Sequence, residues 1–250
     1  MTRPFTTLAT LLVTILAVFC LSVDDVDVPA QQPPQPPSRP GEGVVWTPYP
    51  PLRPSQGLSP QILDQVNSHV SNPGYWRSSD LGNWCHEGTH GCHADLRQKH
   101  GRPALYLGGD LAILLTHPPT TIRRIAACVP VELRGFQYRT YCVSQAGQWD
   151  NEPLYLWDEW AAYVNGARCD PGRTSTLTEY LPIGLAVGLS SPLSGQEAEA
   201  LALLTRLSAE LCDRTHPYVG LLREGSAGSP YRELFQRLYS GRLNLDCLLK

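Results

Sequence analysis

The sequence lacks the features by which several large classes of protein are recognised. It has no block of basic residues, no heptad pattern and no internal repeat, and its formal net charge is only −3. Binding to nucleic acid needs a concentrated cationic face, so we expect no nucleic-acid partner. Only 17% of the residues are charged and 42% are hydrophobic, which is typical of a globular protein with a real core.

Long apolar runs are also scarce, and the one candidate for a membrane span lies at the N-terminus. Arg3 precedes an apolar run from Leu8 to Val23, and acidic residues follow that run. This layout predicts a signal peptide over residues 1–23, or alternatively an uncleaved membrane anchor. We therefore expect an exported protein that is secreted, periplasmic or at the cell surface, and that meets a membrane only through such an anchor.

Export favours disulfide bonds among the eight cysteines, because most thiols pair in an oxidising compartment. Cys85 and Cys92 would lie about 10 Å apart along one helix, which is beyond the reach of a disulfide. Cys128 and Cys142 bracket a short segment that is expected to be extended, and they are a candidate pair.

Prolines are concentrated in one stretch after the apolar N-terminal run. Ten of the 23 prolines lie between Pro29 and Pro54. A stretch of this composition stays extended and builds no core. We therefore expect a disordered linker over residues 24–57 and one folded domain over residues 58–250.

Periodicity and turn residues predict the elements of this domain. Ser59 is expected to cap a first helix, Ser79 or Asp80 a second helix, and Gly101 to end the second one. Two strands are expected on either side of Gly108-Gly109-Asp110, and a further strand over residues 136–144. Helices are expected over residues 119–130, 153–166, 194–214 and 229–241. Short strands among segregated helices indicate an α+β fold.

The stretch HEGTH places His86 and His90 four residues apart, with Glu87 between them. On a helix, residues four apart project from the same face, so the two imidazoles can bind one metal ion. Glu87 lies too far round the helix to join them, but it can contact a water activated by the metal and take its proton as general base. The pattern therefore predicts a catalytic Zn²⁺ site. The glycines in and beside the motif also allow another element to approach this helix closely.

A catalytic zinc site needs a third protein ligand and one open position. His93 is near in sequence, but it lies about 10 Å along the helix from His86 unless the helix breaks at Gly91. His100 falls in the last turn of the helix, where solvation or contact with the helix end is expected. His117 precedes two prolines in a loop.

Glu159 is the third ligand that we favour. It lies in the helix expected over residues 153–166, which is strongly apolar apart from Asp158 and Glu159. Burying a carboxylate there is costly unless something compensates it, and a zinc ion would do so. Alternatively the two carboxylates form the polar face of an amphipathic helix. The flanking Trp157 and Trp160 disfavour this interpretation.

HEGTH followed by a later helix with "EWAA" resembles the zincin metallopeptidases of the glutamate-ligand type, the gluzincins. The resemblance implies metal ligands at His86, His90 and Glu159, a general base at Glu87, and a zincin-like fold. In such a fold the active-site helix and the glutamate-bearing helix pack near a small β-sheet, here with a helical C-terminal part. The glycine and third histidine of the metzincin pattern are missing, so that branch is disfavoured.

The chain also departs from the gluzincin pattern. Some gluzincins place an aspartate one turn after the glutamate to orient a histidine, and Tyr163 stands there in this chain. The group that orients the histidines is therefore unassigned, with Asp95 and Asp158 as candidates.

Hydrolysis of an amide also needs a donor to the developing oxyanion, and Tyr155 and Tyr163 lie one turn either side of Glu159. We therefore predict an exported zinc-dependent metallopeptidase that acts on a peptide or protein substrate. The alternative is an exported zinc-binding or structural domain that keeps the HExxH helix without turnover.

Overall fold

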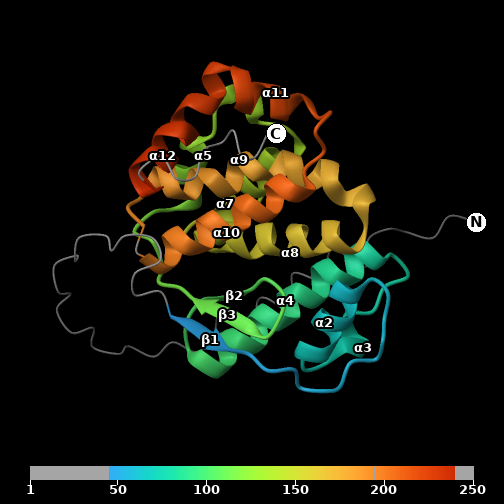
Figure 1. Cartoon of the computed structure of the whole chain (residues 1–250). Helices are drawn as coiled ribbons and strands as arrows, with labels where there is room; N and C mark the ends of the chain where they lie inside the picture. The colour runs from blue at the N-terminus through green and yellow to red at the C-terminus, as the bar shows by residue number, and fades with distance from the viewer. Residues whose placement is uncertain (1–44, 194, 240–250) are drawn as a thin grey trace, which may run out of the picture. The chain divides into compact units, whose positions relative to one another are not determined.

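The computed structural model describes residues 45–193 and 195–239, which form an α+β fold with many helices and a small antiparallel sheet (Figure 1). The predicted signal peptide or anchor and residues 24–44 of the predicted linker lie outside these residues. Within the described part of the chain, no helix combines the length and the apolar character that a bilayer span requires.

The sheet contains three strands in the order β1-β3-β2. β2 (Ala104–Tyr106) and β3 (Leu111–Leu114) form the expected hairpin, which turns at Gly108 and Gly109 with φ of 102° and 72°. β1 (Trp46–Pro48) pairs antiparallel with the other side of β3. Ordered structure therefore begins earlier than expected, because part of the proline-rich stretch completes the sheet.

The first helix, α2 (Gln61–His69), begins later than the sequence indicated. Pro60 and not Ser59 is the N-cap, and no side chain caps the helix. The expected cap at Ser59 is therefore wrong, although the helix itself is confirmed. The short helix α3 (Pro73–Trp76) follows and leads into the histidine-bearing helix.

The histidine-bearing helix, α4 (Leu81–His100), starts and stops where its capping residues predict. The Asp80 carboxylate accepts a hydrogen bond from the Asn83 backbone N–H at 2.9 Å. Gly101 ends the helix in the left-handed conformation with φ of 64°. Residues next to each end of the helix therefore determine where it begins and where it stops.

Two glycines in α4 allow α2 to approach closely, as the sequence suggested. A Cβ added at Gly88 would lie 2.6 Å from Val66 of α2, and one added at Gly91 would lie 2.6 Å from Val70, the C-cap of α2, and 2.5 Å from Trp76 of α3. Larger residues at these positions would push α2 away, so these poor helix formers serve the packing of the domain.

The glutamate-bearing helix, α8 (Tyr155–Cys169), lies at the centre of the fold. The sheet and α2 to α4 lie on one side of it, and the later helices lie on the other (Figure 1). Trp157 and Trp160 are fully buried in the main core. The helix runs beyond Gly166, where the sequence had placed its end. The later helices are α9 (Thr174–Ser190), α10 (Gly195–Leu211), α11 (Pro217–Glu224) and α12 (Ser229–Tyr239).

The segment between the sheet and α8 corrects one prediction. α5 (Ile122–Cys128) is the expected short helix. Residues 136–144 were expected to form a strand but are helical: α6 (Phe136–Tyr138) continues into η3 (Arg139–Ser144), which has π-helical turns. The short helix α7 (Ala146–Trp149) then leads towards α8. Helical backbone lets this segment pack against α5, α7 and α9, and these tertiary contacts override the alternating pattern.

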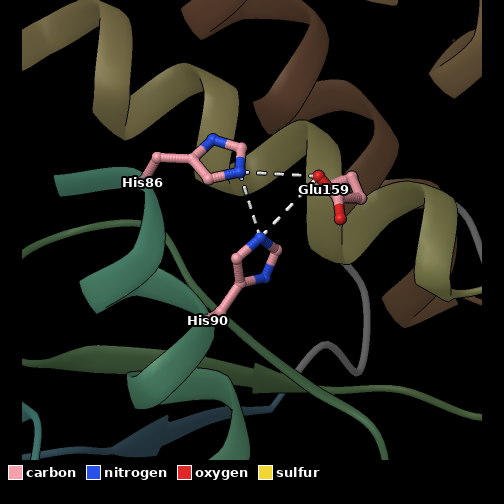
Figure 2. A group of neighbouring side chains, drawn as sticks. All are labelled: His86, His90 and Glu159. Carbon is pink, nitrogen blue, oxygen red and sulfur yellow. Dashed lines mark hydrogen bonds and ion pairs between the residues drawn. The ribbon is translucent and has the colours of Figure 1, made fainter. Parts of the chain in front are cut away.

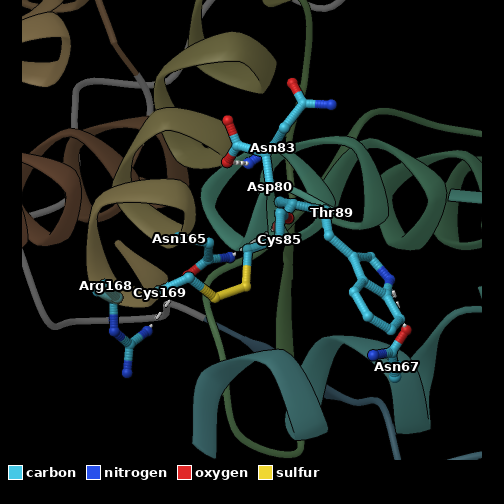
Figure 3. The surroundings of a disulfide bond; sticks show 9 residues. Asn67, Asp80, Asn83, Cys85, Thr89, Asn165, Arg168 and Cys169 are labelled. Carbon is cyan, nitrogen blue, oxygen red and sulfur yellow. Dashed lines mark hydrogen bonds between the residues drawn. A yellow bond between two sulfur atoms is a disulfide. The ribbon is translucent and has the colours of Figure 1, made fainter. Parts of the chain in front are cut away.

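A disulfide between Cys85 and Cys169 joins α4 to the end of α8 (Figure 3). The prediction that Cys85 does not pair with Cys92 is confirmed, whereas the candidate pair of Cys128 and Cys142 is wrong, because both are free thiols. The candidate pair assumed an extended segment between the two residues, and that segment is helical.

Candidate metal centre

His86, His90 and Glu159 come together where α4 faces α8 (Figure 2). The two Nε2 atoms of the histidines lie 3.2 Å apart. Oε2 of Glu159 lies 3.5 Å from Nε2 of His86 and 3.7 Å from Nε2 of His90. The three residues that the sequence proposed as ligands are therefore neighbours, although 69 positions separate the second histidine from the glutamate.

The spacing of these three atoms fits a zinc ion. Ligand atoms about 2.0–2.1 Å from a tetrahedral zinc ion lie about 3.3 Å from one another. The three observed separations, 3.2, 3.5 and 3.7 Å, are close to that value. Two imidazole nitrogens and one carboxylate oxygen also match the donor set of a catalytic zinc site, so the residues present could hold this ion.

The spacing depends on close contact between α4 and α8. A Cβ added at Gly166 would lie 3.1 Å from the carbonyl oxygen of Gly82 and 3.5 Å from Cβ of His86, so the two backbones nearly touch. Beside the disulfide, the amide of Asn165 donates to the hydroxyl of Thr89 at 3.1 Å (Figure 3). A covalent link, a buried hydrogen bond and a glycine contact thus hold the ligand-bearing helices at a fixed distance.

The charges at the centre favour the ionised form of Glu159. Burial opposes the ionisation of Glu159, but His90 and His86 outweigh it and hold the pKa of this carboxyl below its usual 4.5. Burial lowers the pKa of His90, but Glu159 and Asp158 outweigh that effect and hold it well above 6.5. A metal ion that binds here would therefore displace a proton from His90.

Asp158 is the group that orients His90. Its Oδ1 accepts a hydrogen bond from Nδ1 of His90, so the proton that a metal displaces is the one on Nε2, and the Nε2 lone pair is then free to bind the metal. Burial raises the pKa of Asp158, but His93, Arg97 and His90 outweigh it and hold that pKa well below 3.8. The other candidate, Asp95, accepts a hydrogen bond from the backbone N–H of Ser71 at 2.6 Å instead.

His93 has different contacts from the two candidate ligand histidines. Its Nδ1 lies 3.2 Å from Oδ2 of Asp158, and its Nε2 lies 3.2 Å from the backbone carbonyl of Tyr106. His90, His93 and Asp158 lie close enough to one another for a second metal site. The guanidinium of Arg97 already contacts Asp158, however, so this group forms an ion-pair network around a buried carboxylate.

The remaining histidines that the sequence weighed as ligands are not part of the candidate centre. His100 lies in the last turn of α4 and is half-buried. Nε2 of His117 lies 3.7 Å from the exposed carboxylate of Glu152.

The residues with predicted catalytic roles lie around the same centre. Glu87 is half-buried next to His86, and its charge contributes to the raised pKa of Tyr163, which burial and Glu159 raise more. The ring of Tyr163 meets that of His86 edge-on, with 4.6 Å between centroids. Tyr155 donates its hydroxyl to Oε1 of Gln145 at 3.0 Å.

Two residues at the centre, Tyr141 and Gln137, were not predicted from the sequence. Tyr141 donates a hydrogen bond to Oε2 of Glu159 at 3.0 Å, and its hydroxyl lies 2.8 Å from that of Tyr163. Tyr163 also contacts Gln137 at 3.3 Å. Tyr141 and Gln137 come from the segment that was expected to be a strand, and no motif in the sequence marks them.

No protein-family model, curated protein or solved structure matches this chain.

Proposed function

We propose that the protein is an exported zinc-dependent metallopeptidase with a gluzincin-like arrangement of ligands. The observation that carries the proposal is the near-tetrahedral spacing of His86, His90 and Glu159, with Glu87 one residue from the first ligand. A bound zinc ion would supply Lewis acidity, which polarises a peptide carbonyl and makes a water more acidic.

The side chains of this chain would supply the remaining chemistry. Glu87 would accept the proton of the attacking water and pass it to the amine that leaves. Asp158 would keep His90 in the tautomer that presents Nε2. Tyr163, whose ring packs against His86, would donate to the oxyanion with Tyr155 as the second candidate.

Metal analysis and a matched pair of variants test the proposal. We expect the purified full-length protein to contain one zinc ion per chain, and His86→Ala or Glu159→Ala to lose it. Glu87→Gln should keep the zinc and the fold but lose roughly 10²- to 10⁴-fold in the hydrolysis of a peptide library, because only the general base is removed. Unchanged zinc content in His86→Ala would refute the site.

A non-catalytic zinc-binding or structural domain is the second candidate. The hydroxyls of Tyr163 and Tyr155 already have partners in Tyr141, Gln137 and Gln145, so neither donor is preorganised for an oxyanion. Zinc retention without hydrolysis of any library peptide, and with no effect of Glu87→Gln, would favour this function.

A further inference from the structure

We infer that Tyr141 is a positioning residue that fixes the orientation in which the Glu159 carboxylate faces the metal centre. The inference rests on the proposed function, since it assigns a role at the proposed zinc site. It starts from one atom: Oε2 of Glu159 accepts the hydrogen bond of Tyr141 and is also the oxygen nearest to both histidines.

The hydrogen bonds around this atom have a fixed direction. A carboxylate oxygen can only accept, so the single proton of the Tyr141 hydroxyl points at Glu159. Tyr163, 2.8 Å from the Tyr141 hydroxyl, must then donate either to Tyr141 or to Gln137. A phenol that donates to one carboxylate oxygen restrains the plane of the carboxylate, and one oxygen remains aimed at the metal centre.

Tyr141 is itself held in place from two sides. Its side chain is buried, and its ring packs edge-on against Tyr180 with 5.1 Å between centroids. The start of its segment is anchored to α9, because the carboxylate of Glu179 accepts from the backbone N–H groups of Phe136 and Gln137. The donor is therefore oriented before any metal binds.

The π-helical turns of η3 belong to this arrangement. The backbone N–H of Gln145 bonds the carbonyl of Thr140 at 3.0 Å, five residues back. Such wide turns are rare and occur often at functional sites. Here Tyr141 lies in η3 and Gln137 in the preceding α6, and both reach the tyrosine and glutamate cluster on α8.

The alternative is that Tyr141 is a core tyrosine whose hydroxyl merely satisfies a buried carboxylate. Tyr141→Phe separates the two roles, because it removes the hydroxyl and keeps the ring. If Tyr141 positions the ligand, the variant should bind zinc about 10- to 100-fold more weakly in a chelator competition, as is usual when a group that orients a metal ligand is lost. The Co²⁺-substituted variant should also change its visible absorption, because a released carboxylate alters the coordination geometry.

Tyr180→Phe is the matched control. Tyr180 packs against the rings of Tyr141 and Tyr163, but its hydroxyl donates to the backbone carbonyl of Leu156 and not to Glu159. We expect its zinc affinity and Co²⁺ spectrum to equal those of the wild type, and thermal unfolding of each metal-free variant will report any loss of folding.

The outcomes distinguish this inference from the proposed function. Wild-type zinc affinity and an unchanged Co²⁺ spectrum in Tyr141→Phe would overturn the role of Tyr141 and leave the zinc site intact. Equal weakening in Tyr141→Phe and Tyr180→Phe would also overturn it, since the effect would then be one of packing. A wild-type protein that binds no zinc would overturn the proposed function and this inference together.

Discussion

Removal of the Cys85–Cys169 disulfide is expected to be costly for the junction between α4 and α8. The bond closes a loop with a sequence separation of 84 residues. In the chain-entropy model a loop of this length corresponds to about 4.5 kcal/mol at 25 °C, against a typical free energy of unfolding of about 5–15 kcal/mol. The double variant Cys85→Ala/Cys169→Ala should therefore lose a large share of its stability.

Urea unfolding with and without a reductant measures this contribution. Reductant should lower the free energy of unfolding of the wild type towards that of the double variant, which also lacks two buried sulfur atoms, and it should leave the double variant unchanged. Cys142→Ala is the control, because Cys142 is a free thiol with the same exposed fraction as Cys169, 5%. It reports the cost of deleting a buried sulfur without breaking a cross-link.

Two results would refute this reasoning. The first is a wild-type free energy of unfolding that does not respond to the reductant under conditions where the bond is shown to be reduced. The second is a free energy of unfolding of the double variant that lies within about 1 kcal/mol of that of Cys142→Ala, since the contribution of loop closure would then be missing.

Two further predictions concern aspartates whose side chains contact residues of α4. Asp158→Asn should weaken zinc binding about 10- to 100-fold, because His90 loses the carboxylate that fixes its tautomer, whereas Asp95→Asn should leave the affinity unchanged; equal losses in both would contradict this role. Asp80→Ala should lower the free energy of unfolding at pH 7 by about 1 kcal/mol through loss of the N-cap. The backbone N–H of Asn83, together with Arg173, lowers the pKa of Asp80 below 3.8, so this stabilisation is full above that value and is lost as the pH falls through the lowered pKa; an equal difference from the wild type in urea unfolding at pH 7 and pH 2 would show that the charge is irrelevant.

The helix that carries HEGTH could be predicted from the sequence because its determinants are local. Asp80 and Gly101 mark its two ends by hydrogen-bonding and backbone preferences that involve only neighbouring residues. Glu159 could be proposed because an acid in an apolar helix is costly to bury without a partner. The structure places Glu159 beside the histidines, while the metal and the activity stay predictions.

The elements that escaped prediction depend on tertiary contacts. The alternation of residues 136–144 is typical of a strand, yet the segment is helical because it packs against α5, α7 and α9. α9 contains Pro182 and Gly184, which normally interrupt a helix, and the fully buried Trp160 fills the space beside Gly184. The partner of Cys85 lies too far along the chain for any local pattern to reveal it.

The close contact between Gly166 and the Gly82 carbonyl makes the candidate metal centre easier to recognise from a sequence. Gly82 lies four residues before His86, and Gly166 lies seven residues after Glu159. Because a Cβ at Gly166 would press on the Gly82 carbonyl, a chain that builds the same centre needs a very small residue there. A search for distant relatives can therefore combine H-E-x₂-H with a later E-x₆-G, and so use the close approach of two backbones where the motif alone is too short.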